Sequence, residues 1–317
     1  MKITCEKKLA VCILAYNRLS LLKQTIDSVF NSSSNEYQIF VLNDNSTDGT
    51  NEYLDNIKKE KNIIEIRHEN NIGMGRNANY IIENINARYC LMLHDDDILG
   101  KDFIKEILEL AEQDENIAIA GTGLNTIGDD NNIVETIVYN KYDKAVILGY
   151  KEYLYDHVDG LSFPWSGSLI RMDKIKNHRF DFTSHPYCAD SVFLNSLVIG
   201  EKVGYIPKPL FNSRFHRNQV TKKIQKNDFD LIYKEWFYDF EFYKKIFKDN
   251  NFGKDIYKKH NAATNRIMLH LIIIAPNFKY YFKFLFSKYF HLFLLSPKNI
   301  LRIFYKFFKL LFHFKKN

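Results

Sequence analysis

The chain has 317 residues, of which 46% are hydrophobic and 26% charged, and this is enough apolar material to bury a large core. Its four cysteines show no CxxC spacing, which argues against a disulfide framework or a zinc site and favours reduced thiols in a cytosolic protein. The N-terminal residues lack the pattern of a secretion signal, and the longest uncharged stretch near the C-terminus, residues 267–278, is too short to span a membrane.

The first hundred residues alternate between short apolar runs and amphipathic segments. The apolar runs have strand length and almost no polar interruption, which is typical of parallel strands covered on both faces. The segments between them are long enough to join parallel strands through a helix, and Ser20 is a good cap for the first helix. We therefore predict a doubly wound, mostly parallel α/β sheet. The expected strands cover residues 9–16, 37–42, 62–67 and 88–93, and the helices between them cover 21–30, a segment ending at 57 and a segment ending at 84.

Polar residues follow each of these four strands. Because the carboxyl ends of parallel strands meet at one edge of a sheet, these residues are expected to line a common crevice, and nucleotides are the commonest ligands of such crevices. The four strand ends are Tyr16-Asn17-Arg18, Asp44-Asn45, His68-Glu69-Asn70 and Asp95-Asp96-Asp97.

The acidic cluster Asp95-Asp96-Asp97 permits two interpretations. Three adjacent carboxylates repel one another, and a hard divalent cation such as Mg²⁺ or Mn²⁺ neutralises them well. Alternatively, the cluster is a solvated turn ahead of the next helix, with Asp97 near the N-cap, because helix starts favour aspartate. Considered alone, the cluster favours the cap; the three preceding polar strand ends favour the metal.

The remaining elements are less regular. We expect a helix over residues 101–113, strands over 117–122 and 133–139, and an aromatic and proline-containing stretch, 162–172, leading into a strand. A helix over 191–199 precedes two short strands, 204–206 and 211–216, with Pro207 and Pro209 between them. Apolar residues recur at helical spacing over 227–275, which predicts a helical annex.

The last forty residues have an unusual composition. The chain carries a net charge of +6, yet from residue 277 onward it has nine basic and no acidic residues, so the preceding part is net negative. Aromatic and aliphatic side chains recur there at helical spacing beside a stripe of lysines, which suits an interfacial helix on anionic lipid. Packing on the domain is the main alternative. Nucleic-acid binding fits less well, because so many phenylalanines are too apolar for a solvated groove.

Residues 73–78, GMGRNA, match the G-x-G-x-x-A pattern of a dinucleotide-binding turn, with Asp95 about twenty residues further on. The context disagrees with this interpretation. That pattern belongs to the first strand–helix turn of the sheet, whereas two complete strand–helix units precede it here. A nicotinamide or flavin oxidoreductase is therefore not expected.

Four motifs in order, each at a strand end, resemble the family 2 glycosyltransferases of the GT-A fold. They are YNR after the first strand, NDNSTDGT after the second, NIGMGRN after the third and LHDDD after the fourth. The match is close over the first hundred residues and looser up to Thr221. Three positions depart from the family pattern: Asn43 replaces an acid, Gly75 replaces an alanine, and His94 stands where some members have the first aspartate of D-x-D.

The resemblance implies roles for individual residues. Tyr16 and Asp44 match positions that contact the nucleotide base, Arg76 matches one that faces base or phosphate, and Asp95 matches a ribose or base contact. Asp96 matches the carboxylate that holds the metal bridging the diphosphate, with Asp97 a lesser candidate. The nucleotide-binding set expected from these matches is Ala15, Tyr16, Arg18, Asp44, Arg76 and Asp95.

Three further residues complete the expected site. Asp190 resembles the family's catalytic base, although it could equally be the N-cap of the following helix. His216, in a segment resembling R-x-H, is a candidate for metal ligation or diphosphate binding, although a lone histidine is often structural. Trp165 is a candidate platform for the acceptor or the sugar, with core packing as the alternative.

The resemblance implies an inverting, Mn²⁺- or Mg²⁺-dependent glycosyltransferase that uses a nucleoside-diphosphate sugar, with UDP as the expected nucleotide. We expect a glycan or lipid-linked acceptor, cell-surface polysaccharide synthesis and a peripheral location on the inner face of the membrane, without nucleic acid. A sugar nucleotidyltransferase and an inactive membrane-bound glycan-binding module are the alternatives. The predicted organisation is a nucleotide-sugar half (1–100), an acceptor half of the same domain (101–226), the helical annex (227–276) and an amphipathic tail (277–317).

Overall fold

The structure is a computed structural model that describes residues 2–175, 177–186, 188–215 and 229–274. The chain divides into two compact units, each of which is treated by itself. The larger unit comprises residues 1–154 and 161–219, and the smaller comprises residues 155–160 and 220–317. The predicted tail, 277–317, lies outside the described residues, as does His216.

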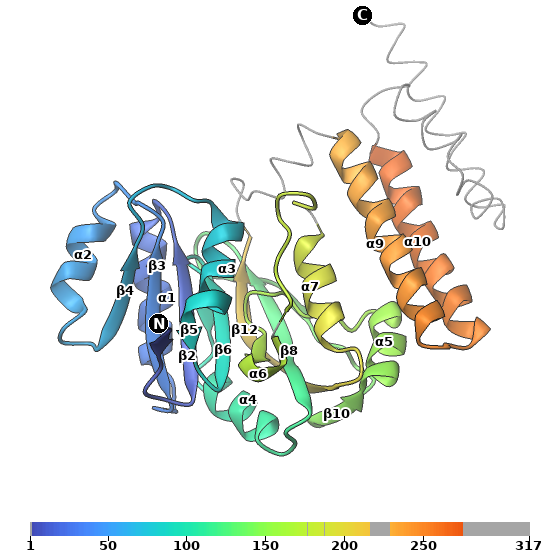
Figure 1. Cartoon of the computed structure of the whole chain (residues 1–317), viewed down its shortest axis with the longest axis horizontal. Helices are drawn as coiled ribbons and strands as arrows, with labels where there is room; N and C mark the ends of the chain where they lie inside the picture. Colours follow the sequence, from blue (N-terminus) through green and yellow to red (C-terminus); the bar gives the residue numbers. More distant parts are fainter. Residues whose placement is uncertain (1, 176, 187, 216–228, 275–317) are drawn as a thin grey trace, which may run out of the picture. The chain divides into compact units, whose positions relative to one another are not determined.

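A mixed, mostly parallel sheet forms the centre of the larger unit (Figure 1). The strand order is β10-β12-β8-β11-β6-β2-β3-β4, in which β6, β2, β3 and β4 are parallel neighbours and β11 inserts antiparallel between β6 and β8. The predicted α/β fold class is confirmed. The strands on this path are β2 (Leu9–Ala15), β3 (Tyr37–Asn43), β4 (Ile63–Arg67), β6 (Tyr89–His94), β8 (Ile117–Ile127), β10 (Val146–Gly149), β11 (Leu169–Arg171) and β12 (Lys202–Arg214).

Four short strands complete the sheets. Strand β7 pairs with β12 and β9 pairs with β8, both antiparallel, while β1 and β5 form a separate parallel pair. Their bounds are β1 (Ile3–Thr4), β5 (Ile85–Asn86), β7 (Ile98–Leu99) and β9 (Ile133–Ile137).

Helices cover both faces of the parallel strands. As a result, every residue of β2 is buried. Alternate residues of β2, such as Val11 and Ile13, pack in one cluster with Ile26 of α1 and Ile104 of α4. Figure 1 shows α1 behind these strands and α3 in front of them. The helices of the larger unit are α1 (Leu19–Phe30), α2 (Thr50–Ile57), α3 (Met74–Asn84), α4 (Phe103–Ala111), the start of α5 (Tyr150–Asp159), α6 (Met172–Ile175) and α7 (Ala189–Leu197).

Several predicted boundaries were wrong. Helix α1 has Arg18, and not Ser20, at its N-cap. The two short strands expected around Pro207 and Pro209 are one long strand, β12, whose pairing with β8 shifts register between Ile206 and Phe211. A bulge lets a strand continue through prolines that cannot donate to the ladder, so the prolines marked an irregularity rather than a strand end.

Gly167 precedes β11 and is needed for backbone conformation and for space. Its φ is +89°, and an added Cβ would lie 2.7 Å from the Phe211 ring. We expect Gly167→Ala to lower the free energy of unfolding by about 1–3 kcal/mol, measured by urea denaturation. Gly149→Ala is the matched control, since nothing lies within 4 Å of a Cβ there. Equal stability of the two variants would contradict the expectation.

The smaller unit contains the end of α5 and two longer helices, α9 (Phe229–Asp249) and α10 (Lys254–Ile274). His157 of α5 bonds the Tyr243 hydroxyl at 2.7 Å, and His260 of α10 stacks on Phe240 of α9 with ring centroids 4.9 Å apart. Burial lowers the pKa of His260 to about 4, so its ring is neutral near pH 7. Within the described part of the chain, no helix combines the length and apolarity needed to cross a membrane.

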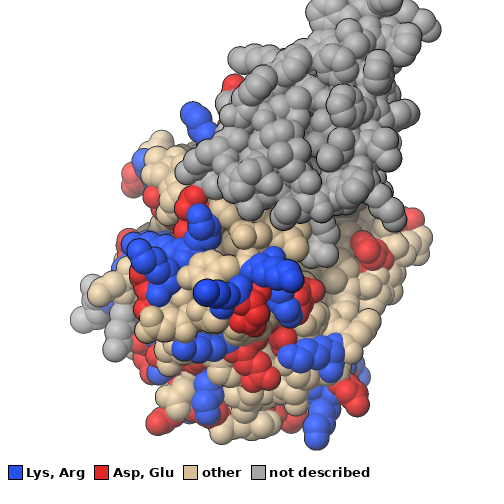
Figure 2. All heavy atoms as spheres, turned by 90° about the vertical axis from the view of Figure 1, so that its right-hand side faces the viewer, with Lys and Arg blue, Asp and Glu red and all other residues tan. Residues whose placement is uncertain are grey.

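Charged side chains are mixed on the surface. Figure 2 shows one face on which Lys and Arg are interspersed with Asp and Glu among the described residues. The four cysteines are buried and no disulfide links them.

Candidate active site

The carboxyl ends of the parallel strands meet at one edge of the sheet, as the sequence predicts. The register aligns Ala15 of β2 with Asn43 of β3, Asn43 with Arg67 of β4, and Leu14 of β2 with His94 of β6. The loops that leave these strands therefore start beside one another.

The loops after β2 and β3 are joined by Asn17. Its backbone N–H donates to the Ser46 hydroxyl at 3.1 Å, and its side-chain oxygen accepts the Thr47 N–H at 2.7 Å. Asn17 has φ +51°, a left-handed conformation that asparagine tolerates better than most residues. These contacts fix Tyr16, whose side chain is 46% exposed beside the loop.

Asp44 is buried and holds the loop that leads into α3. Its two carboxylate oxygens accept the backbone N–H groups of Ile72 and Gly73 at 2.8 and 2.9 Å. Arg76, which is exposed, follows on the first turn of that helix. The structure thus gives Asp44 a positioning role, while its contact with a nucleotide base stays a prediction.

Arg18 connects the first strand end to the acidic cluster. Its guanidinium donates to Asp95 at 3.2 Å and to Asp96 at 2.9 Å, and Asp95 also accepts the Tyr16 N–H at 3.0 Å. Burial raises the pKa of Asp95 to about 6, although the charge of Arg18 opposes the rise. Residues predicted from different motifs therefore lie in direct contact.

Asp97 is not a helix cap, so the cap interpretation was wrong. Helix α4 begins at Phe103, with Asp102 at its N-cap. One carboxylate oxygen of Asp97 accepts the Arg214 backbone N–H at 3.2 Å, and the other accepts the Ser166 hydroxyl at 2.5 Å. Asp97 thereby ties the acidic turn to β12 and to the segment ahead of β11.

Arg214, the last residue of β12, is the arginine of the segment that resembles R-x-H, and the sequence analysis gave it no role of its own. Its side chain is 1% exposed and lies under the acidic turn. The guanidinium donates to the Asp96 carbonyl at 3.0 Å, to the Gly128 carbonyl at 2.8 Å and to the Asn131 side chain at 2.6 Å. The available signal was the position of this arginine, two residues before His216 in that segment.

His94 and Trp165 lie against each other beside the cluster. Their rings meet edge to face with centroids 4.8 Å apart, and the His94 backbone N–H donates to Ser166 at 3.0 Å. Trp165 is only 5% exposed and also packs on Phe180 and Phe182. This burial favours the core-packing alternative for Trp165; its role as an acceptor platform stays a prediction.

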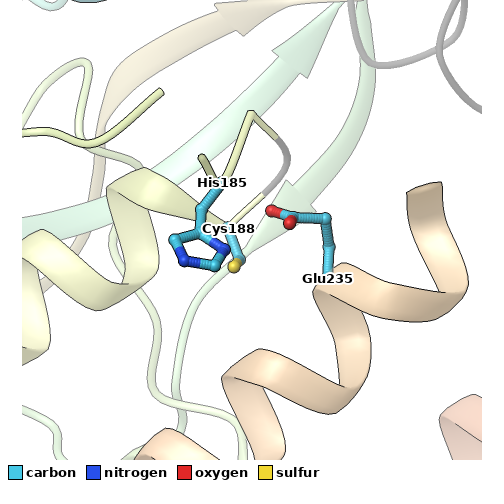
Figure 3. Close-up of side chains that lie close together, drawn as sticks. All are labelled: His185, Cys188 and Glu235. Carbon is cyan, nitrogen blue, oxygen red and sulfur yellow. The ribbon is translucent and has the colours of Figure 1, made fainter. Parts of the chain in front are cut away.

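Asp190 lies in the first turn of α7, and Cys188 is the N-cap residue. The preceding turn carries His185 and Cys188, whose side chains are labelled in Figure 3. The backbone carbonyls of His185 and Cys188 accept the N–H groups of Ala189 and Val192. Glu235, which Figure 3 also labels, belongs to the smaller unit. Burial raises the pKa of Asp190, while the Ser191 N–H at 2.8 Å and the charge of His94 oppose the rise. Asp190 therefore interacts electrostatically with His94, the residue that precedes the acidic turn.

Three side chains at the acidic cluster could hold a divalent cation. One ligand atom each from His94, Asp96 and Asp97 lies within 4.8 Å of the others. The Nε2 atom of His94 is buried and has no hydrogen-bond partner in the described structure, which is costly unless something binds it. Carboxylate oxygens with one imidazole suit Mn²⁺, and the oxygens alone suit Mg²⁺.

Comparisons with known proteins agree with this architecture. The sequence model of glycosyl transferase family 2 matches residues 10–179, more than half of the chain. Among similar sequences, EpsH of Bacillus subtilis, named a glycosyltransferase, is 22% identical over 226 residues, covering 70% of this chain and 64% of EpsH. The GalNAc(5)-diNAcBac-PP-undecaprenol β-1,3-glucosyltransferase of Campylobacter jejuni is 26% identical over 223 residues, covering 69% of each.

Solved structures show the same fold. TarS of Staphylococcus aureus superposes with a TM-score of 0.63 at 13% identity, over 92% of this chain and 50% of TarS. Residues 1–349 of TarS in complex with UDP-GlcNAc superpose with a TM-score of 0.57 at 13% identity, over 85% of this chain and 82% of that one. The chain belongs to glycosyl transferase family 2.

Proposed function

We propose that this chain is an inverting, metal-dependent glycosyltransferase that moves a sugar from a nucleoside-diphosphate sugar, with UDP as the nucleotide, to a hydroxyl of a glycan or lipid-linked acceptor. The observation that carries the proposal is the acidic turn, which Arg18 and Arg214 fix at the end of β6 and whose neighbour His94 interacts electrostatically with the half-buried Asp190. The UDP-GlcNAc complex of TarS supports the donor class.

Asp190 would act as the general base. Its raised pKa makes it a stronger proton acceptor than an ordinary aspartate, and it would take the proton from the acceptor hydroxyl as that oxygen attacks the anomeric carbon. Inversion follows if the attack comes from the face opposite the diphosphate. The diphosphate departs with the bonding electron pair, and a cation held by Asp96, and by His216 as the resemblance implies, would stabilise that negative charge.

The nucleoside would lie along the loops after β2, β3 and β4. Tyr16 offers an exposed aromatic ring, Arg76 an exposed cation on the first turn of α3, and Asp95 a carboxylate at the same edge. Ala15 is the last residue of β2 and directly precedes Tyr16. These positions support the nucleotide-binding role that the resemblance implies.

The name of the Campylobacter relative supports a lipid-linked acceptor and synthesis of a cell-surface polysaccharide. We propose the same setting here, with the chain at the inner face of the membrane. The basic and aromatic sequence of residues 277–317 supports a membrane contact.

Asp96→Asn tests the donor site. We expect the thermal stabilisation given by Mn²⁺ plus UDP-sugar to disappear, because removing the charged carboxylate weakens the cation site and hence binding of the diphosphate. A thermal-shift panel of UDP-, GDP- and dTDP-sugars with and without Mn²⁺ measures this. Glu109→Gln, which removes an exposed charge from α4, is the control. A wild-type protein that no nucleotide sugar stabilises would count against the proposed function, and an Asp96→Asn protein stabilised normally would count against the metal assignment.

A further inference from the structure

His94 is fixed in position and yet has an unused nitrogen. Its ring is held by the edge contact with Trp165 and by the Ser166 bond to its backbone, and its Nδ1 lies 3.5 Å from a carboxylate oxygen of Asp97. The side chain is 31% exposed, but its Nε2 atom is buried and lacks a hydrogen-bond partner in the described part of the chain. Nδ1 is therefore the nitrogen that faces the carboxylates. Nε2 is a second buried nitrogen, and it needs a proton acceptor or ligand of its own.

The neighbouring carboxylates keep room for a ligand. Asp97 accepts bonds from Ser166 and Arg214, and Asp96 accepts one from Arg18. An ionised carboxylate has about four acceptor positions, so a carboxylate can accept such bonds and also bind a cation. The Arg18 guanidinium already places a positive charge against Asp96 at 2.9 Å, so a metal ion would share that carboxylate with Arg18.

We propose that His94 is a direct ligand of the active-site cation, together with Asp96 and Asp97, and that it makes the site select a first-row transition-metal ion such as Mn²⁺ or Co²⁺ over Mg²⁺. This inference rests on the metal dependence in the proposed function. The ligand atoms lie within 4.8 Å of one another. Two ligand atoms about 2.1 Å from one ion are at most about 4.2 Å apart, so closing the site needs a contraction of up to about 0.6 Å.

The selectivity follows from ligand chemistry. Mg²⁺ prefers oxygen ligands and gives up its water reluctantly, whereas imidazole nitrogen binds transition-metal ions better along the series from Mn²⁺ through Co²⁺. A site of two carboxylates holds both classes of ion. The same site with His94 added holds Mn²⁺ or Co²⁺ more tightly, while Mg²⁺ gains little.

Direct metal titration of the full chain, without nucleotide, tests this inference. Mn²⁺ binding is followed by loss of the free-ion EPR signal, and Mg²⁺ binding by competition against Mn²⁺. We expect His94→Ala to weaken Mn²⁺ binding about 10–100-fold and Mg²⁺ binding by less than about threefold. His94→Asn, which offers an amide oxygen, should keep Mg²⁺ binding and also lose the preference for Mn²⁺. In the Co²⁺-loaded protein, the visible absorption bands should shift in both variants.

His178→Ala is the control, because His178 is a half-buried histidine that bonds Ser196 away from the cluster. Thermal unfolding of each apo variant shows that it is folded. If His94→Ala leaves Mn²⁺ affinity and the Co²⁺ spectrum unchanged while Asp96→Asn abolishes Mn²⁺ binding, His94 is not a ligand and the metal site itself stands. If the wild type and Asp96→Asn bind Mn²⁺ equally weakly, the metal dependence of the proposed function is wrong. Equal losses of Mn²⁺ and Mg²⁺ in His94→Ala would overturn the selectivity.

Discussion

Replacing Asp190 with asparagine is expected to lower the rate of sugar transfer by about 10²–10⁴-fold, because the acceptor hydroxyl loses its proton acceptor. Nucleotide-sugar affinity should change little, since the nucleotide-binding residues lie on the loops after β2, β3 and β4 while Asp190 lies on α7. Single-turnover transfer assays and donor titrations measure the two effects separately. Unchanged turnover in Asp190→Asn would reject Asp190 as the base. A wild-type protein without transfer activity would instead favour the inactive glycan-binding module.

The pH dependence gives a second readout of the same residue. Burial raises the pKa of Asp190, and a general base works in its deprotonated form, so activity should fall as the pH drops through that raised pKa. The loss should therefore begin at a higher pH than an ordinary aspartate would give. Asp190→Asn should lack this acid limb in whatever activity remains.

Stability provides the control for Asp190→Asn. In a group whose folded-state pKa is raised, the ionised form disfavours folding at pH values above the unfolded pKa. Removing that charge should leave the free energy of unfolding unchanged or increase it, which is typical of a functional residue held in an unfavourable environment. Asp181→Asn, an exposed change in the segment just ahead, is the matched variant for activity. A loss of activity that accompanies unfolding in Asp190→Asn would contradict the assignment.

The strand-end part of the site was predictable from the sequence because its physics is local. An apolar run such as residues 9–15 is typical of a strand buried on both faces, and parallel strands bring their carboxyl ends to one edge. The positions of Tyr16, Asp44 and Asp95 follow from that rule alone. The family motifs added the expected roles of these residues, but their position at one edge of the sheet could be predicted without knowledge of the family.

The supports of the acidic turn were not predictable in the same way. Ser166 reaches Asp97 across 69 positions in the sequence, and Arg214 reaches Asp96 across 118. No local pattern encodes such contacts, because they depend on how β11 inserts between β6 and β8 and on where β12 ends. The same reason explains the error over Asp97: its local context favours a helix cap, and tertiary contacts override that preference.

Arg214→Ala is expected to cause the largest loss of stability, about 3–5 kcal/mol in the free energy of unfolding. The change removes donors from the Asp96 and Gly128 carbonyls and from the side chains of Gln24 and Asn131, and leaves a cavity in a fully buried position. Urea denaturation measures the effect. Arg214→Lys should recover only part of the loss. The lysine keeps a positive charge and some donors, but an ammonium group cannot reach all of these acceptors at once.

Arg179→Ala provides the comparison, since Arg179 forms an exposed ion pair with Glu83 that contributes at most about 1 kcal/mol. A similarly small effect at Arg214 would show that its hydrogen bonds are replaced by water and that the turn needs no anchor. In Arg214→Lys, which is expected to remain folded, weaker Mn²⁺-dependent donor binding should accompany the loss of stability, because the Asp96 backbone loses a defined position. Arg214 would then stabilise the fold and also hold the Asp96 backbone, and with it the carboxylate proposed to bind the cation that stabilises the leaving group.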